Sequence, residues 1–195
     1  HSQNDDTTLE GAKFGLYSKE TIKINGRTVL DKDTLIQSST SNRDGIAEFT
    51  ADIPINYTYY IREIQAPEKY YMSDETYEFT YTYKNDQTYE YVFSHGFQNE
   101  EVRAKIHVRK IDKETHEFLS QGDAALIGAE YGLFAAEDIQ HPNKKSGTVH
   151  KKGELVSKEK INENGELDFT DLYLGKYCIR ELAASEGYLL DPTEY

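Results

Sequence analysis

The sequence predicts an all-β chain made of two tandem antiparallel domains, each a sandwich or a barrel. Three observations support this fold class. A long pattern of residues occurs twice, apolar and polar residues alternate over short segments, and Asp-Gly or Asn-Gly pairs separate those segments. Short strands with tight turns at regular spacing are typical of antiparallel sandwiches and barrels.

The internal repeat defines the two domains. "LEGAKFGLYSKETI" begins at Leu9, and "LIGAEYGLFAAEDI" begins at Leu126. Further along, "NRDGIAEFT" matches "NENGELDFT", and "YIREI" matches "CIREL". A repeat of this length exceeds a solenoid unit and is large enough to hold a core of its own. We therefore predict domains at residues 1–101 and 102–195, joined by a very short linker.

Side-chain alternation locates individual strands. In "TYEFTYTY", residues 76–83, aromatic residues alternate with threonine and glutamate, which is the two-residue period of a half-buried strand. "YEYVF" begins at Tyr89, after a polar turn at residues 84–87, so the two segments are predicted to form a hairpin. The Asp-Gly pair of the first repeat and the Asn-Gly pair of the second are predicted turns, because such pairs readily adopt positive φ.

Composition excludes several classes of function. The formal net charge of −13 argues against nucleic acid and against docking on anionic lipid, since both partners need clustered lysine and arginine. No apolar run approaches the length of a membrane span. Cys178 is the single cysteine, so no internal disulfide can form. The histidines lack the spacing of metal ligands, and no phosphate-binding loop is present, so we expect neither metal nor cofactor.

Four polar residues share an alternating face with apolar neighbours: Glu63, Asn99, Lys110 and Glu181. Burying a lone charge costs several kcal/mol or forces the group to neutralise. Burial is expected to lower the pKa of Lys110 and to raise that of Glu181. A neutral amine is a nucleophile, and a protonated carboxylic acid can relay protons. With an asparagine amide as the third group, the available reaction is amide formation with loss of ammonia.

Several motifs together carry a family resemblance. "KIDKET", "LIGAEYGLF", "NENGELDF" and "YCIRELAASEGYLL" resemble the B-type domain of Gram-positive collagen adhesins and the related SpaA-type pilin domain, also called prealbumin-like. Both repeats match the pattern, and together they cover essentially the whole chain. The family's Ala-Pro-x-Gly-Tyr turn is altered, to "APEKY" in the first repeat and "ASEGY" in the second.

The resemblance implies two tandem prealbumin-like, immunoglobulin-like antiparallel β-sandwiches with an autocatalytic isopeptide bond in each. Carried over position by position, the second domain supplies Lys110 as nucleophile and Glu181 as catalyst, while the first supplies Glu63 as catalyst and Asn99 as acceptor. By the same comparison the first domain lacks its N-terminal, lysine-bearing strand, and the second lacks its last strands. Each domain therefore holds two of the three cross-linking residues.

Structural roles for these residues remain open. Lys110 could extend past the strand edge into solvent, as most lysines do. The two glutamates could pair with Arg62, Arg180 or backbone amides, and Asn99 could cap a turn.

The resemblance predicts a structural stalk or adhesive segment of an extracellular, cell-wall-anchored Gram-positive surface protein or pilin. No enzymatic activity beyond self-catalysed cross-linking is expected. Expected partners are host matrix proteins or glycans, or neighbouring domains of the same protein, and the chain is expected to be monomeric unless a sortase polymerises it. The alternative is a ligand-binding module that grips a host protein or glycan through long variable loops at 23–41 and 140–160. A transthyretin-like enzyme ranks last, because no catalytic cluster converges.

Overall fold

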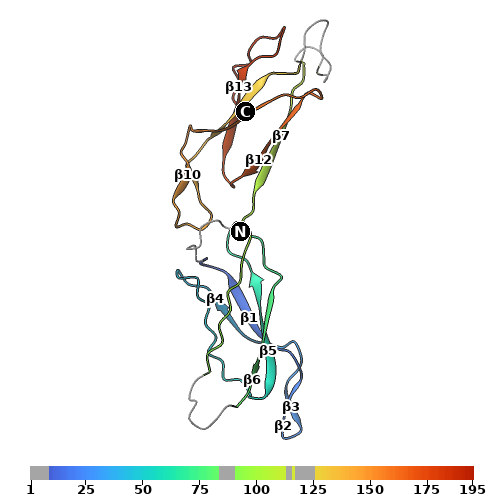
Figure 1. Ribbon diagram of the computed structural model, residues 1–195, viewed down its shortest axis with the longest axis vertical. Coiled ribbons are helices and arrows are strands. Elements are labelled where there is room, and N and C mark those ends of the chain that lie inside the picture. The colour runs from blue at the N-terminus through green and yellow to red at the C-terminus, as the bar shows by residue number, and fades with distance from the viewer. Residues whose placement is uncertain (1–8, 84–90, 113–115, 117–125) are drawn as a thin grey trace. The chain divides into compact units, whose positions relative to one another are not determined.

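The computed structural model describes residues 9–83, 91–112, 116 and 126–195, and the regular elements in these ranges are all β-strands (Figure 1). The chain divides into two compact units, His1–Glu101 and Val102–Tyr195, here called unit 1 and unit 2. The predicted turn at 84–87, together with Tyr89, lies outside the described residues. Within the described ranges, no helix is long and apolar enough to cross a membrane.

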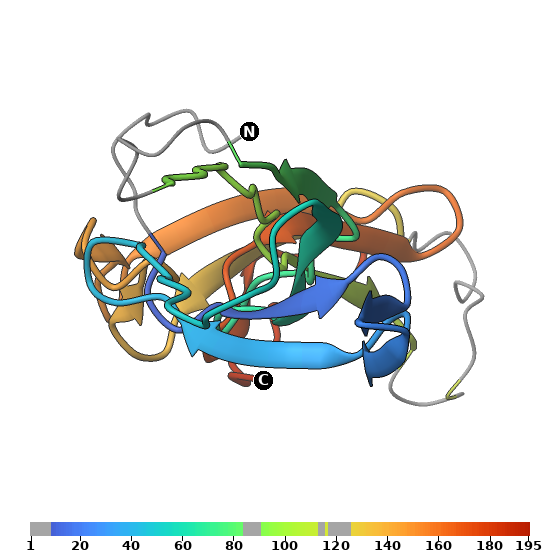
Figure 2. The ribbon, with the colours of Figure 1, turned by 90° about the horizontal axis from the view of Figure 1, so that it is seen from below.

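Unit 1 is built on a four-stranded antiparallel sheet with the order β4-β1-β5-β6. Its strands are β1 (Lys13–Ser18), β4 (Leu35–Thr40), β5 (Tyr57–Gln65) and β6 (Thr76–Tyr81). β1 and β4 lie side by side and run in opposite directions (Figure 2). A separate hairpin joins β2 (Ile22–Ile24) to β3 (Arg27–Leu30).

Unit 2 repeats this order in a three-stranded antiparallel sheet, β11-β8-β13, and adds a second sheet. The first sheet contains β8 (Glu130–Ala135), β11 (Leu155–Lys160) and β13 (Tyr177–Ala183). The second sheet pairs β7 (Ala104–Arg109) with β12 (Glu166–Leu172). A small hairpin joins β9 (Ile139–Gln140) to β10 (Thr148–His150).

The repeat found in the sequence is also a repeat of strand register. In unit 1, Phe14 of β1 lies opposite Glu63 of β5. In unit 2, Tyr131 of β8 lies opposite Glu181 of β13. The central strand of each main sheet therefore places an aromatic residue beside the repeated glutamate.

The core of unit 2 lies between its two sheets. Leu133 on the three-stranded sheet and Phe169 on β12 are fully buried, and Ile106 and Val108 of β7 pack against this cluster. The alternate β7 side chains are exposed, as the two-residue period predicts. The strands are thus amphipathic elements that bury one face each, which is how two sheets form a sandwich.

The core of unit 1 is less completely covered. Leu16, Ile22 and Tyr59 are buried, whereas Phe49 and Phe79 are only partly buried. Residues 46–54 and 91–100 belong to no strand, although 46–52 align with the residues of β12. The layer opposite the main sheet therefore lacks a hydrogen-bonded strand pair in the described part of unit 1.

Both predicted Gly turns are confirmed. Gly45 has φ of 74° and Gly165 has φ of 77°, a region that glycine enters at little cost. In each turn the asparagine three residues earlier accepts two backbone N–H groups with Oδ1: Asn42 from Asp44 and Ile46, and Asn162 from Asn164 and Glu166. The side chain thus replaces backbone partners at the bend, as Asx turns do.

Two expectations about chain segments are wrong. Residues 23–41 and 140–160 are not long loops, because they contain β3 and β4 in unit 1 and β10 and β11 in unit 2. The first segment carried a missed hairpin signal, since Asn25 and Gly26 both have positive φ between β2 and β3. The expected hairpin partner of β6 is also absent as a strand in residues 91–93, which instead meet β6 through side chains.

Candidate cross-linking sites

Lys110 and Glu181 form a buried ion pair in unit 2. Lys110 directly follows β7, and its backbone N–H donates to the carbonyl of Gly165, which extends the β7–β12 ladder by one residue. Its Nζ donates to Glu181 Oε1 at 2.6 Å, and the two side chains are 11% and 0% exposed. The other oxygen, Oε2, accepts the backbone N–H of Asp191 at 2.6 Å. The two strands therefore deliver opposite charges to one point of the core.

The pKa of Lys110 does not move in the expected direction. Burial lowers it, but hydrogen bonds from Nζ to Glu181 and to the Tyr131 hydroxyl, together with the charge of Glu181, outweigh burial and raise the pKa above its usual value. The prediction of a lowered pKa is wrong because it considered burial without the partner. Lys110 is therefore an ammonium group, and a nucleophilic amine arises only when a proton leaves it.

Glu63 and Asn99 meet at the corresponding place in unit 1. Glu63 is 1% exposed, and its Oε2 accepts the backbone N–H of Ser73 at 2.6 Å, as Glu181 does from Asp191. The same Oε2 accepts Nδ2 of Asn99 at 2.7 Å, and Nδ2 also donates to the carbonyl of Tyr71 at 2.9 Å. A backbone bond from Tyr71 N–H to the Glu100 carbonyl holds this stretch in place.

The second carboxylate oxygen of Glu63, Oε1, differs from its counterpart in unit 2. Among the described residues, Oε1 of Glu63 is buried and has no hydrogen-bond partner. Its counterpart in unit 2, Oε1 of Glu181, binds the ammonium of Lys110. A buried carboxylate oxygen without a donor is costly, so this position is suited to a cationic N–H group.

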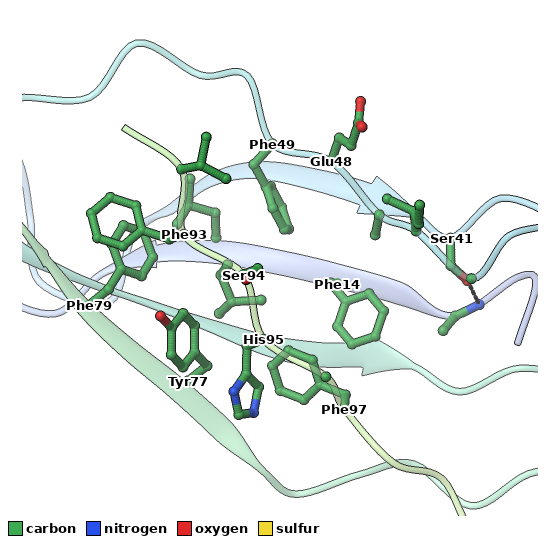
Figure 3. Close-up of a pocket in the computed structure, with 18 of the residues that line it drawn as sticks. Phe14, Ser41, Glu48, Phe49, Tyr77, Phe79, Phe93, Ser94, His95 and Phe97 are labelled. Carbon is green, nitrogen blue, oxygen red and sulfur yellow. Dashed lines mark hydrogen bonds between the residues drawn. The ribbon is translucent and has the colours of Figure 1, made fainter. Parts of the chain in front are cut away.

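A groove of about 1170 Å³ crosses the inner face of the unit 1 sheet. One wall is formed by residues 45–53, the other by residues 91–100 including Asn99, and the floor by side chains of β1, β5 and β6. Figure 3 shows aromatic rings from both sides of this space: Phe14, Phe49, Tyr77, Phe79, Phe93, His95 and Phe97. Both walls lie outside any strand, and the groove presents apolar side chains along its length.

The segment that carries Asn99 is held over the sheet by stacked rings. His95 stacks on Tyr77 with ring centroids 4.5 Å apart, and its Nε2 lies 2.6 Å from Glu75 Oε1. Two residues later, Phe97 packs on Phe14 at 4.9 Å. These contacts place every second side chain on the sheet, which brings Asn99, the next in the series, to Glu63.

The predicted site residues therefore fall into two pairs. Lys110 contacts Glu181, and Asn99 contacts Glu63; each pair lies within a single unit. Sequence reasoning missed Tyr131, whose hydroxyl accepts from Lys110 Nζ at 3.2 Å. The sequence did carry a signal for it, because the repeat aligns Tyr131 with Phe14, so that the second unit has a hydroxyl where the first has none. Among the described residues, no cluster of three or more histidine, cysteine, aspartate or glutamate side chains has the arrangement of a metal site.

One protein family matches both units of the chain. The SpaA family, described as a prealbumin-like fold domain, matches the chain over residues 1–95 and again over 104–195. The chain belongs to the SpaA family. Each match lies within one of the two units, so both units are SpaA domains with a prealbumin-like fold.

Three solved structures that match the chain come from Gram-positive bacteria. The Bacillus anthracis TIE protein is 22% identical, with a TM-score of 0.61, and the match covers 100% of this chain and 29% of that protein. A streptococcal ancillary pilin is 17% identical, with a TM-score of 0.35 and coverage of 96% and 53%. The shaft pilin SpaA from Lactobacillus rhamnosus GG is 15% identical, with a TM-score of 0.34 and coverage of 96% and 83%. No curated protein sequence matches the chain.

Proposed function

We propose that the chain is a stalk segment of a Gram-positive surface protein or pilus, in which each SpaA domain is closed by an amide bond between a lysine and an asparagine or aspartate. The observation that carries this proposal is the paired placement of Lys110 on Glu181 Oε1 and of Asn99 on Glu63 Oε2, at equivalent glutamates. Unit 2 shows the lysine beside its glutamate, and unit 1 shows the asparagine beside its glutamate. Between them, the two units contain each of the three groups that the reaction needs. The family match supports the structural role.

The two oxygens of each glutamate have separate tasks in this reaction. The oxygen that faces lysine accepts a proton from the ammonium, which frees the lone pair on Nζ. Nζ then bonds to Cγ of asparagine, the Cγ–Nδ2 bond breaks, and the nitrogen leaves as ammonia after protonation by the carboxyl group. One further proton from the lysine nitrogen goes to solvent. In unit 1, Nδ2 of Asn99 already lies on Oε2, which is where a proton donor to the leaving group must be.

The groove of unit 1 fits a strand that resembles β7. In unit 2, β7 pairs with β12, buries Ala104, Ile106 and Val108 in the core, and then presents Lys110 to the glutamate. The equivalent strand for unit 1 would pair with residues 46–52, fill the apolar floor and bring an ammonium to Oε1 of Glu63. We propose that a lysine-bearing segment of the longer protein supplies it, and that a segment bearing asparagine or aspartate completes unit 2.

An amide bond between the first and last strands gives the segment its mechanical role. Load applied along a chain of such domains would pass through the covalent bond and not through the hydrogen bonds of the sheets. The domain then cannot extend, and its loops are less exposed to proteases. The rival function, ligand binding by residues 23–41 and 140–160, would have to use the turns between the strands of those segments.

Intact-mass measurement tests the proposal. A longer chain that includes the segments flanking both units is expected to weigh less than its calculated mass, by one ammonia for each lysine–asparagine bond or one water for each lysine–aspartate bond. Lys110→Ala should abolish the loss from unit 2, and Asn99→Ala should abolish the loss of ammonia from unit 1. Lys105→Ala, on the exposed face of β7, is the matched control and should leave both losses unchanged. A parent mass equal to the calculated value would reject cross-linking.

A further inference from the structure

The hydroxyl of Tyr131 is a third polar group at the Lys110–Glu181 pair. Tyr131 is 7% exposed, and its hydroxyl accepts from Lys110 Nζ at 3.2 Å. The register of β8 with β13 places it directly opposite Glu181. The nitrogen also lies 5.6 Å from the centre of the Tyr131 ring. Lysine, glutamate and tyrosine therefore share one buried cluster, although only the first two take part in the proton transfers described above.

Unit 1 shows that packing alone does not require this hydroxyl. Phe14 occupies the equivalent register opposite Glu63, and its ring packs against Phe97. Phenylalanine thus satisfies the aromatic position in the same fold. A buried hydroxyl needs hydrogen-bond partners, and in unit 2 these are the lysine nitrogen and the side chain of Glu181. The hydroxyl that unit 1 lacks therefore contacts both members of the Lys110–Glu181 pair.

The ammonium of Lys110 has three N–H bonds, and two of them are accounted for. One points to Oε1 of Glu181 and another to the hydroxyl of Tyr131. These two acceptors hold two of the N–H bonds and prevent the ammonium from turning about the Cε–Nζ bond. Burial raises the pKa of Tyr131 above its usual value, so the phenol stays neutral and accepts from the ammonium at physiological pH.

We propose that Tyr131 is a positioning residue for the Lys110 amine, whose hydroxyl fixes the direction of the nitrogen beside Glu181. This inference rests on the proposed function, because it takes the Lys110 nitrogen to be the nucleophile. It also makes the two SpaA domains different, since the aromatic residue beside Glu63 offers no hydroxyl to a lysine. Reaction geometry is sensitive to small displacements, so loss of this contact slows bond formation without removing any reacting group.

Titration of Lys110 in the present chain tests the contact directly. In Tyr131→Phe the side chain of Lys110 stays buried while one hydrogen bond is lost, so its pKa should fall relative to the parent. Nitrogen-15 NMR of the lysine Nζ groups measures this pKa and the exchange rate of the ammonium protons, which should increase. Tyr177→Phe is the matched control, because it removes another half-buried hydroxyl of unit 2, one that donates to the Tyr173 carbonyl. It should leave the titration of Lys110 unchanged.

An unchanged Lys110 pKa in folded Tyr131→Phe would overturn the inference. If that variant does not fold, replacing tyrosine by 3-fluorotyrosine keeps the ring and the hydroxyl but weakens the oxygen as an acceptor, and the pKa should again fall. The outcome is separable from the test of the proposed function. A longer chain that loses neither ammonia nor water rejects cross-linking whatever the titration shows. A chain that cross-links at the same rate with and without the hydroxyl rejects the positioning role.

Discussion

Unit 1 and unit 2 have the same central strands in the same order, yet they differ in the layer that faces the main sheet. In unit 2, β7 and β12 form a hydrogen-bonded pair over the core, and Phe169 is 1% exposed. In unit 1, the matching Phe49 lies on a segment outside any strand and is only partly buried at the wall of a groove. The main sheet and the repeated turns therefore form without the opposite strand pair, whereas full burial of the core depends on it.

The two glutamates show the same contrast at the level of single atoms. Both accept a backbone N–H with Oε2, so each is anchored in the same way. Glu181 has an ammonium on its other oxygen, whereas Oε1 of Glu63 has no hydrogen-bond partner among the described residues. One buried charge is compensated by an opposite charge, whereas the other, in the part of the chain that the structure describes, accepts hydrogen bonds from neutral donors. Substitutions that remove these charges should therefore affect the two units differently.

The largest effect is expected from Glu181→Gln compared with Glu63→Gln. Removing the charge of Glu181 leaves the ammonium of Lys110 buried without its counter-ion, which costs about 3–5 kcal/mol of the free energy of unfolding of unit 2. Removing the charge of Glu63 leaves no buried cation without a counter-ion among the described residues. The free energy of unfolding of unit 1 should therefore fall by less than about 0.5 kcal/mol, or rise. Hydrogen exchange in increasing urea, read separately on peptides from each unit, measures both values. Equal losses in the two units would contradict this comparison.

A second difference is expected when the aligned phenylalanines are truncated. Phe169→Ala should lower the free energy of unfolding of unit 2 by about 3–5 kcal/mol, because a buried ring is replaced by a cavity. Phe49→Ala should cost unit 1 only about 1–2 kcal/mol, since part of that ring already faces the groove. Unit-resolved unfolding in urea distinguishes the two values. A loss for Phe49→Ala as large as that for Phe169→Ala would show that the groove is closed in solution.

The smallest effect concerns Tyr59 and emerges only at alkaline pH. Burial, with a smaller contribution from the nearby Tyr57 and Glu20, raises the pKa of Tyr59 to about 12, and its hydroxyl donates to the Pro54 carbonyl at 2.6 Å. In the unfolded chain the phenol ionises near pH 10. Above about pH 10 the unfolded state therefore binds fewer protons than the native state, and stability falls as pH rises toward 12.

Urea midpoints of unit 1 at pH 9 and pH 11 measure this slope. The parent should lose more stability between the two values than Tyr59→Phe, which has no phenol at this position to ionise. In unit 2, Tyr177 aligns with Tyr59, and burial raises its pKa as well, so Tyr177→Phe should flatten the slope of unit 2 in the same direction. Identical slopes for parent and variant would show that Tyr59 titrates as an exposed tyrosine.

Part of the candidate site followed from the sequence because strand periodicity is local. The alternation of Tyr59, Ile61 and Glu63 predicts that the glutamate points inward, and it is buried. The pKa of Lys110 was not accessible in the same way, since its direction depends on hydrogen bonds to Glu181 and Tyr131 from two other strands. The β2–β3 hairpin could have been predicted from the sequence but was not. Its turn, Asn25-Gly26, is a typical hairpin turn pair, but the segment was interpreted as a loop.

Local sequence patterns were sufficient to predict the all-β class, the duplicated unit, the Asx-Gly turns and the inward direction of the repeated glutamates. These properties follow from contacts between residues close in the chain and from the two-residue period of a strand. Three further features are visible only in the folded chain: which glutamate oxygen contacts a lysine, which contacts an asparagine, and where a groove takes the place of a strand pair. Those outcomes depend on atoms brought together from distant segments, whose register and burial no local pattern encodes.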